Sequence, residues 1–241
     1  MSGRALLSGR KLVKAFGGLV AVNNVSFDLY EGEILGLIGP NGAGKTTLFN
    51  LITGFLKPDA GRVLFRGRDI TRLSAHARAK LGIGRTFQLV RPFLRLTVLE
   101  NVMTAAFART DDVEEARERA LEVLELVDMY DVRNRLASSL TLVNRKRMEL
   151  ARALALEPEV LLLDELIAGL NPKEVDEMLD LLRDIHAKGI TLFIIEHVMR
   201  AVMGICQRIL VMHYGRLIAQ GTPEEVANDP KVVEAYLGGA L

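Results

Sequence analysis

The 241-residue sequence predicts an α/β fold in which helices flank a mixed β-sheet. Continuous apolar runs, typical of buried parallel strands, occur at residues 34–38, 160–163 and 190–195. Helical patterns separate these runs, and one predicted helix begins at Pro172. A glycine-rich turn directly follows the first run and leads into a helix, so the sequence also predicts a strand–turn–helix unit.

The composition is that of an ordinary globular protein with a core of its own. Hydrophobic residues make up 49% and charged residues 25% of the chain, and the net charge of +1 gives no general reason to expect a nucleic-acid partner. The single cysteine, Cys206, excludes an internal disulfide and suits a reducing cytoplasm. The first 14 residues lack the apolar core of a signal peptide, and no apolar run approaches the roughly 20 residues that span a bilayer.

The N-terminal part predicts an antiparallel β subdomain beside the α/β core. Residues 5–30 are β-rich with a turn at Gly17-Gly18, and a further strand at 62–65 follows a turn at 57–61. A short helix is expected at 75–81 and a strand at 82–88.

A helical lobe is expected at residues 89–155, between two parts of the α/β core at 1–88 and 156–241. Apolar residues recur there at helical spacing, and the charges from Asp111 to Arg119 indicate the solvated face of a helix. Ser138 or Ser139 is expected to cap the last helix of the lobe.

The turn after residue 38 has the G-x-x-x-x-G-K-[ST] spacing of a phosphate-binding loop. Glycines let the backbone curl its N–H groups around an anion, and the following helix N-terminus attracts negative charge. Lys45 is expected to reach the β- and γ-phosphates and Thr46 to bind Mg²⁺. A purely structural glycine-rich turn is the alternative. The residues expected to bind the nucleotide are Gly39, Asn41, Gly42, Gly44, Lys45, Thr46 and Thr47. The fold is therefore predicted to be a P-loop NTPase.

Asp164 and Glu165 directly follow the apolar run 160–163. In a P-loop protein an aspartate here helps to hold Mg²⁺, and the next carboxylate polarises the attacking water. An isolated Asp-Glu pair would otherwise be ordinary surface charge. Together with the phosphate loop, the pair predicts hydrolysis of the bound nucleotide.

With these motifs the chain resembles, over essentially its whole length, the ATP-binding cassette family of transporter ATPases. The resemblance implies one cassette domain at 1–241, in which Phe16 stacks on adenine. It further implies that Gln88 touches Mg²⁺ and the attacking water, and that His197 contacts the γ-phosphate. Residues 168–172 match the loop that crosses the dimer interface.

More narrowly, residues 84–88 and 97–101 look like those of ATP-binding subunits of branched-chain amino acid importers, as do the C-terminal segments 223–226 and 233–238. The resemblance implies that ATP hydrolysis by this chain powers a membrane importer for branched-chain or related amino acids. The segment Arg85–Gln88 favours one of the two paired ATPase types of these importers.

The resemblance also implies partners. Two ATPase subunits form a homodimer or a heterodimer, sandwich ATP and drive an integral membrane permease. The resemblance to one of two paired types favours the heterodimer. A solute-binding protein takes part indirectly. The expected location is cytoplasmic, peripheral on the inner face of the cell membrane.

Two positions depart from the family pattern. The signature, usually Leu-Ser-Gly-Gly-Gln, acts on the ATP of the partner chain and aligns with Leu140, Thr141, Leu142, Val143 and Asn144. Val143 adds bulk and disfavours a positive φ, which predicts impaired turnover at the site that uses this signature. Leu166 replaces the usual proline and is expected to loosen the loop that aims Glu165.

Three alternatives to the importer ATPase remain at this point. An ATP-gated clamp would close on ATP but hydrolyse it poorly. A cassette protein with a soluble partner usually carries two cassettes or long inserted arms. A small-molecule P-loop kinase would leave Gln88, the signature segment and His197 without roles. The cations Arg145, Lys146 and Arg147 most simply indicate a solvated helix face, and a phosphate clamp is the alternative.

Overall fold

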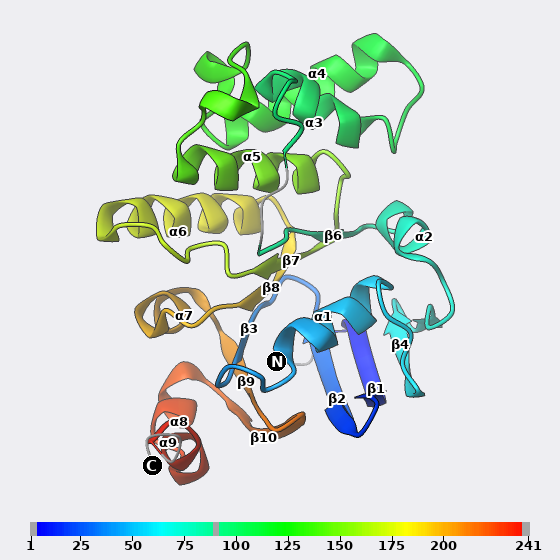
Figure 1. The fold of residues 1–241 in the computed structure, drawn as a ribbon, viewed down its shortest axis with the longest axis vertical. Coiled ribbons are helices and arrows are strands. Elements are labelled where there is room, and N and C mark those ends of the chain that lie inside the picture. The colour runs from blue at the N-terminus through cyan, green and yellow to red at the C-terminus, as the bar shows by residue number, and fades with distance from the viewer. Residues whose placement is uncertain (1–3, 89–91, 238–241) are drawn as a thin grey trace. The chain divides into compact units, whose positions relative to one another are not determined.

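The structure is a computed structural model that describes residues 4–88 and 92–237 (Figure 1). Its contacts divide the chain into two compact units. We call residues 4–78 and 191–237 the first unit, and the described part of residues 79–190 the second unit. Gly238, the last residue of the predicted C-terminal motif, lies outside the described residues.

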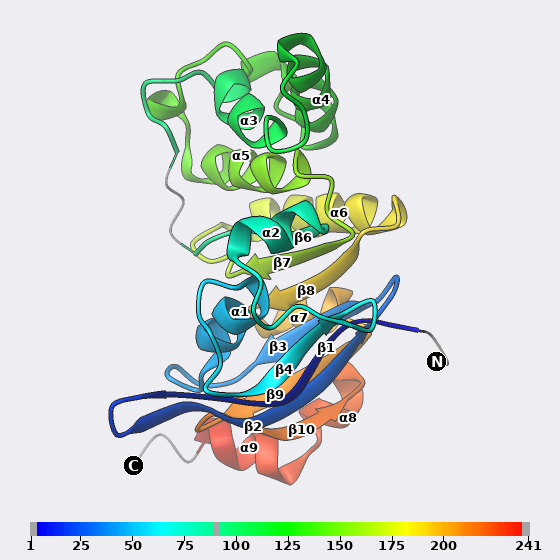
Figure 2. The same ribbon diagram turned by 90° about the vertical axis from the view of Figure 1, so that its right-hand side faces the viewer.

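An antiparallel sheet forms one part of the first unit, with strand order β2-β1-β4-β5. Its strands are β1 (Ala5–Phe16), β2 (Leu19–Tyr30), β4 (Ala60–Phe65) and β5 (Arg68–Asp69). The two long strands run side by side in Figure 2 and join at Gly17, whose φ is +57°. The predicted antiparallel β subdomain is confirmed.

A second group of strands in the same unit has the order β10-β9-β3-β8. These strands are β3 (Ile34–Ile38), β8 (Thr191–Ile195), β9 (Arg208–His213) and β10 (Arg216–Gly221). All five residues of β3 are buried, and β3 pairs in parallel with both β8 and β9. The continuous apolar sequence of β3 follows from this central position, because both faces of the strand are covered.

Helices α1 (Lys45–Thr53), α2 (Ala75–Lys80), α7 (Met199–Ile205), α8 (Pro223–Ala227) and α9 (Pro230–Leu237) accompany these strands. Phe49 of α1 packs on Phe193 of β8 with ring centroids 5.0 Å apart. This contact fixes the helix that follows the phosphate loop on the sheet from which the loop emerges.

The second unit contains the parallel strands β6 (Ile83–Arg85) and β7 (Val160–Asp164). Its helices are α3 (Val98–Ala106), α4 (Val113–Leu126), α5 (Leu142–Leu154) and α6 (Pro172–Ala187). Short 3₁₀ turns occur at Tyr130–Val132 and Ala137–Ser139. The unit therefore holds two strands and α6 in addition to the helices of the expected lobe, whose boundaries stay a prediction.

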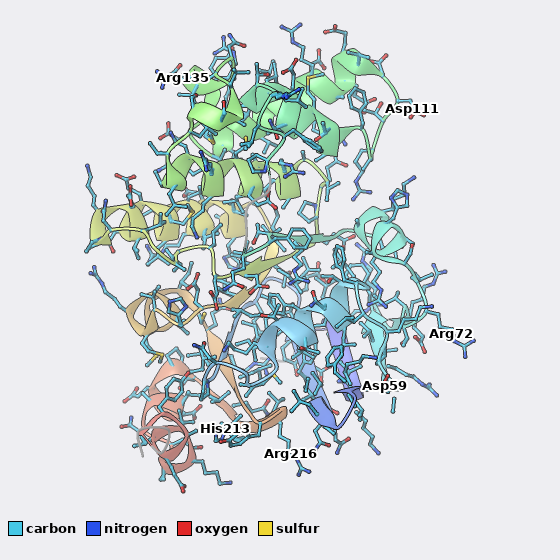
Figure 3. All side chains as sticks on the ribbon, viewed as in Figure 1. Asp59, Arg72, Asp111, Arg135, His213 and Arg216 are labelled. Atoms are coloured by element: carbon cyan, nitrogen blue, oxygen red, sulfur yellow. The ribbon has the colours of Figure 1, made fainter. Side chains whose placement is uncertain are left out.

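Helix α4 buries one apolar stripe and exposes its charges, as the sequence predicts. Ala116, Ala120 and Leu124 are fully buried, whereas most of the charged residues between them are exposed. Figure 3 shows Asp111 in the exposed loop that leads to this helix. None of the helices in residues 4–88 and 92–237 is long and apolar enough to cross a membrane.

The predicted cap of α5 is wrong. Thr141 is the N-cap, and its hydroxyl accepts a hydrogen bond from the N–H of Asn144. Ser139 instead lies in a 3₁₀ turn, where its hydroxyl donates to the carbonyl of Leu136. The turn engages the hydroxyl of Ser139, and the cap of the helix lies two residues later, at Thr141.

Candidate functional site

The phosphate loop lies between the end of β3 at Ile38 and the start of α1 at Lys45. Gly39 and Gly44 have φ angles of +152° and +101°, which L side chains rarely adopt. A Cβ at Gly39 would lie 2.1 Å from the carbonyl oxygen of Met212, and one at Gly44 would lie 2.1 Å from that of Ala21. Neighbouring backbone therefore fixes the loop, and both positions require glycine.

Lys45 folds back over this loop. Its Nζ donates to the carbonyls of Gly39 at 2.7 Å and Pro40 at 3.0 Å, and the residue is 8% exposed. Gly44, the N-cap of α1, provides no side-chain cap. Backbone N–H groups at the helix start, together with a positioned ammonium, form a geometry suited to an anion. Thr46 is exposed beside them.

The C-terminal helix of the first unit also reaches the loop. The backbone N–H of Gly39 donates to the hydroxyl oxygen of Tyr236, while burial raises the pKa of Tyr236 above its usual value. An open pocket beside the loop is lined by Pro40 and Asn41 and by Lys231 and Glu234 of α9. The phosphate loop thus rests on the C-terminal segment of the chain.

Two further predicted site residues belong to the first unit. Phe16 ends β1 with 47% of its surface exposed, and the Nζ of Lys14 lies 5.6 Å from its ring centroid. An exposed aromatic ring beside a cation is able to stack on a nucleobase. His197 is exposed in the loop between β8 and α7.

The predicted carboxylates lie at the end of β7 in the second unit. Asp164 is buried, and its Oδ2 accepts a hydrogen bond from Nη2 of Arg85 at 2.8 Å. Burial lowers the pKa of the Arg85 guanidinium, and the neighbouring Asp164 carboxylate opposes that shift. The N–H of Asp164 donates to the hydroxyl of Thr86 at 3.3 Å.

Glu165, the predicted base, has a backbone φ of +52°. Such a conformation costs about 1–3 kcal/mol in a residue other than glycine and is typical of functional sites. Its Oε2 accepts a hydrogen bond from Nε2 of Gln88 at 2.6 Å, and its carbonyl accepts one from Nζ of Lys146 at 3.1 Å. The structure therefore brings the two predicted catalytic residues of this unit together.

The prediction of a solvated face for the cations after the signature is wrong. Lys146 is 5% exposed because it reaches Glu165. Arg147 forms ion pairs with Asp128 at 2.8 Å and Glu177 at 3.2 Å, and Arg145 donates to the carbonyl of Ser138. These contacts give each cation a structural partner.

Helix α5 also contacts the segment before Gln88. Glu149 accepts a hydrogen bond from the backbone N–H of Phe87 and pairs with Arg152 at 2.9 Å. Burial raises the pKa of the Glu149 carboxyl, and Arg152 opposes that shift. The helix that begins at the signature therefore supports both Glu165 and the chain leading to Gln88.

The signature segment has a regular helical start. Leu140 is buried, Thr141 caps α5, and Leu142 is 51% exposed and lies beside Gly169 of the next loop. Val143 is the second residue of the helix and is not among the residues with positive φ. The predicted conflict between Val143 and a positive φ is therefore wrong, and only the added side-chain bulk remains.

The predicted loosening of the loop at Leu166 is not what the structure shows. Leu166 is 4% exposed, so its side chain anchors the loop. The N–H of Ala168 donates to the Glu165 carbonyl at 3.4 Å, and that of Leu170 donates to the Ile167 carbonyl at 3.2 Å. Asn171 then forms a capping box at the start of α6.

The sequence did not identify two residues as parts of this site. Arg85 stood in a family motif without a role of its own, and Lys146 stood in a run of cations that was predicted to form a solvated helix face. In the sequence, both residues are cations within three positions of Gln88 or of the signature. This position alone does not indicate which residue each cation contacts.

Residues 22–168 match the protein family described as ABC transporter. The chain belongs to the ATP-binding cassette family of transporter ATPases. Residues 216–241 of the cassette also match the family described as branched-chain amino acid ATP-binding cassette transporter. The cassette is 46% identical to the high-affinity branched-chain amino acid transport ATP-binding protein LivG of Salmonella typhimurium, and the match covers 98% of each chain.

Solved structures of ATP-binding cassettes have the same fold as this chain. The cassette superposes on the ADP conformation of the ATP-binding cassette MJ1267 with a TM-score of 0.89, 35% identity and coverage of 97% and 99% of the two chains. It also superposes on the dimeric structure of the cassette MJ0796 bound to ADP and phosphate, with a TM-score of 0.81, 27% identity and coverage of 90% and 98%. The predicted P-loop NTPase fold is confirmed.

Proposed function

We propose that this cassette hydrolyses ATP to power the import of branched-chain or related amino acids. The observation that carries the proposal is the pairing of Glu165 with Gln88 in a chain that matches LivG over 98% of its length. The C-terminal segment that reaches the phosphate loop belongs to the part that matches the branched-chain amino acid family, which supports the same solute class.

In this proposal, Phe16 stacks on adenine, while the loop N–H groups and Lys45 bind the phosphates. Glu165 accepts a proton from the attacking water, Gln88 orients that water, and His197 contacts the γ-phosphate. The remaining phosphate-loop contacts are made by Asn41, Gly42, Gly44 and Thr47. Residues 140–144 act on the ATP bound by a second cassette.

The oxygen ligands available in the chain fit Mg²⁺. Thr46 and Asp164 provide hard oxygen atoms, the donor type that this ion prefers, and Gln88 provides a third. Among the described residues no group of three or more His, Cys, Asp or Glu side chains is arranged to hold a metal. Oxygens of the nucleotide phosphates would complete the shell, as is usual for Mg²⁺ bound with a nucleotide. Bound Mg²⁺ would neutralise charge on the phosphates.

The proposed partners are a second ATP-binding cassette and an integral membrane permease, with a solute-binding protein acting through that permease. The dimeric structure of MJ0796, in which a related cassette is bound to ADP and phosphate, supports the ATP-bound dimer. The proposed location is peripheral, on the cytoplasmic face of the membrane. Nucleic acid is not among the proposed partners.

The relatives favour the importer ATPase over the ATP-gated clamp and the cassette with a soluble partner. Purification of the tagged chain from its own cells tests this choice. We expect a multi-helix membrane protein to co-purify and ATPase activity of the complex to rise with leucine-loaded binding protein. Co-purification with ribosomes or DNA instead would contradict the transport role.

Lys45→Ala is expected to weaken ATP binding by about 10- to 100-fold, because a charge-assisted hydrogen bond contributes about 1.5–3 kcal/mol. Equilibrium dialysis with radiolabelled ATP measures the effect. Lys57→Ala is the matched control, since Lys57 is an exposed lysine of the same unit. Equal ATP affinities for the two variants would contradict the proposed role of the phosphate loop in ATP binding.

Val143→Gly separates the effect of bulk from that of backbone conformation. Because Val143 is helical, glycine is expected to destabilise the start of α5 by up to about 0.5 kcal/mol. If the valine side chain obstructs the partner's ATP, turnover of the assembled dimer rises despite this loss. ATPase rates and thermal melts of both proteins provide the measurement. Equal turnover would show that Val143 does not impair hydrolysis.

A further inference from the structure

Arg85 and Asp164 form a buried ion pair that the proposed hydrolysis does not use. Nη2 of Arg85 lies 2.8 Å from Oδ2 of Asp164, and the two side chains are 5% and 1% exposed. A buried charge needs a partner because water cannot solvate it. The guanidinium therefore provides a charged partner for the carboxylate inside the protein.

The surroundings of the pair hold the arginine at this oxygen. Arg85 ends β6 opposite Leu162 of β7, and the N–H of Thr86 donates to the Leu162 carbonyl at 2.9 Å. The Arg85 guanidinium lies 5.1 Å from the ring centroid of Phe87, whose backbone N–H donates to Glu149. Strand pairing on one side and α5 on the other thus fix the segment that carries the arginine.

The same segment also holds the second carboxylate. Gln88, three residues after Arg85, donates a hydrogen bond at 2.6 Å to Glu165, the residue after Asp164. Both carboxylates at the end of β7 are therefore engaged by one short stretch of chain. Any metal ion that binds Asp164 therefore approaches a carboxylate that already contacts the Arg85 guanidinium.

Two cations at one buried carboxylate repel each other, and the repulsion is strong where water is excluded. Mg²⁺ alone gains too little from a single carboxylate to overcome a guanidinium, and it prefers to keep its water shell. Phosphate oxygens add ligands and negative charge, which shift the balance toward the metal. The ion pair thus favours the metal–nucleotide complex over free metal.

We propose that Arg85 is a positioning residue that holds the Asp164 side chain in place before nucleotide binds and competes with Mg²⁺ for its carboxylate. This inference rests on the proposed role of Asp164 as a metal ligand. Its consequence is selectivity: the cassette takes up Mg²⁺ together with ATP and does not bind the free ion at this carboxylate.

The test compares metal binding by the wild type and by Arg85→Met, which removes the charge at similar length. Two measurements are made, neither of which depends on hydrolysis. The first is Mn²⁺ binding without nucleotide, followed by electron paramagnetic resonance. The second is the Mg²⁺ enhancement, defined as the ATP dissociation constant in EDTA divided by that in Mg²⁺.

We expect Arg85→Met to raise the Mg²⁺ enhancement about tenfold, the ratio produced by about 1.4 kcal/mol of lost competition. Nucleotide-free Mn²⁺ binding should become detectable, and the thermal midpoint of the metal-free protein should fall. Arg85→Lys retains a cation and should stay within about twofold of the wild type. Arg85→Gln keeps a neutral donor for Asp164 and is the second variant if methionine prevents folding, with the same expected rise.

Arg208→Met is the matched control. It removes the cation that contacts Glu33 at 2.8 Å in the first unit, where Glu33 is 2% exposed. This variant should lower thermal stability and leave the Mg²⁺ enhancement unchanged. A shift as large as that of Arg85→Met would mean that loss of stability alone changes metal binding, and would overturn the inference.

Asp164→Asn distinguishes the inference from the function on which it rests. Suppose that Asp164→Asn loses the Mg²⁺ enhancement but Arg85→Met leaves this enhancement unchanged or lowers it. The proposed competition between Arg85 and Mg²⁺ is then overturned, and Asp164 remains a metal ligand. If Asp164→Asn keeps the enhancement of the wild type, the proposed metal role of Asp164 is itself wrong. A tenfold rise for Arg85→Met, with loss for Asp164→Asn, supports the competition.

Discussion

Glu165→Gln is expected to lower the rate of ATP hydrolysis by about 10²- to 10⁴-fold, the contribution typical of a positioned general base. The amide keeps the shape of the side chain but cannot accept a proton. ATP binding should change little, because the contacts of Lys45 with the phosphate loop lie in the first unit. Single-turnover hydrolysis and equilibrium ATP binding, measured on the same preparation, separate the two effects.

Glu157→Gln is a matched control for this prediction. Glu157 lies in the same unit and also has a positive φ, of 49°, but it pairs with Arg119 at 2.9 Å. The same chemical change there should leave hydrolysis within about twofold of the wild type, as is usual for surface substitutions. A hydrolysis rate for Glu165→Gln within tenfold of the wild type would assign the base to another residue.

The sequence predicted the parts of the fold that local patterns determine. The apolar run 34–38, followed by glycines and Lys45, predicts a buried strand, a phosphate loop and a helix, because each step uses residues that are adjacent in the chain. Pro172 likewise predicted the start of α6, and the structure has a capping box there. These elements depend on few distant contacts.

Contacts between distant side chains and backbone carbonyls escaped prediction. Lys146 looks like a surface cation in the sequence, since its partner is the carbonyl of Glu165 and every residue carries a carbonyl. Hydroxyls at Ser138, Ser139 and Thr141 are equally able to cap a helix, and only the 3₁₀ turn before α5 selects Thr141. A tertiary contact decided the first case, and a local 3₁₀ turn decided the second.

Contacts of α5 and Gln88 hold Glu165 in place in the absence of nucleotide. Lys146 of α5 holds the strained backbone at Glu165, while Gln88 holds its side chain. Glu149, also on α5, fixes the N–H of Phe87 between Arg85 and Gln88. Movement of the helix that begins at the signature would therefore change the aim of Glu165, a coupling that lies entirely within the second unit.

Arg78 has a comparable role at the far end of the phosphate-binding helix, although nothing in the segment 75–80 distinguishes it from the exposed Lys80. It is 1% exposed, and its Nη1 donates to the carbonyls of Leu51 and Ile52 in the last turn of α1. Further donations from the same guanidinium reach Leu73 at 3.2 Å and Thr71 at 2.8 Å. These carbonyls carry the negative end of the helix dipole, which a cation stabilises.

Arg78→Met is therefore expected to lower the free energy of unfolding by about 3 kcal/mol. Each buried carbonyl left unsatisfied costs about 1–3 kcal/mol, and removal of the buried charge offsets part of this loss. Urea denaturation followed by circular dichroism measures it. Burial lowers the pKa of Arg78 to about 10, so the guanidinium stays charged near neutrality and the loss should be the same at pH 6 and pH 8.

Lys80→Met, on the same helix, removes an exposed charge and should change stability by less than about 0.5 kcal/mol. Arg78→Lys should fall between the two variants, because an ammonium has three donors where the guanidinium has five. If Arg78→Met unfolds like Lys80→Met, the carbonyls at the end of α1 find other donors and the arginine is dispensable. Weaker ATP binding by a folded Arg78→Met would show that the C-terminal end of α1 helps to position its N-terminal phosphate site.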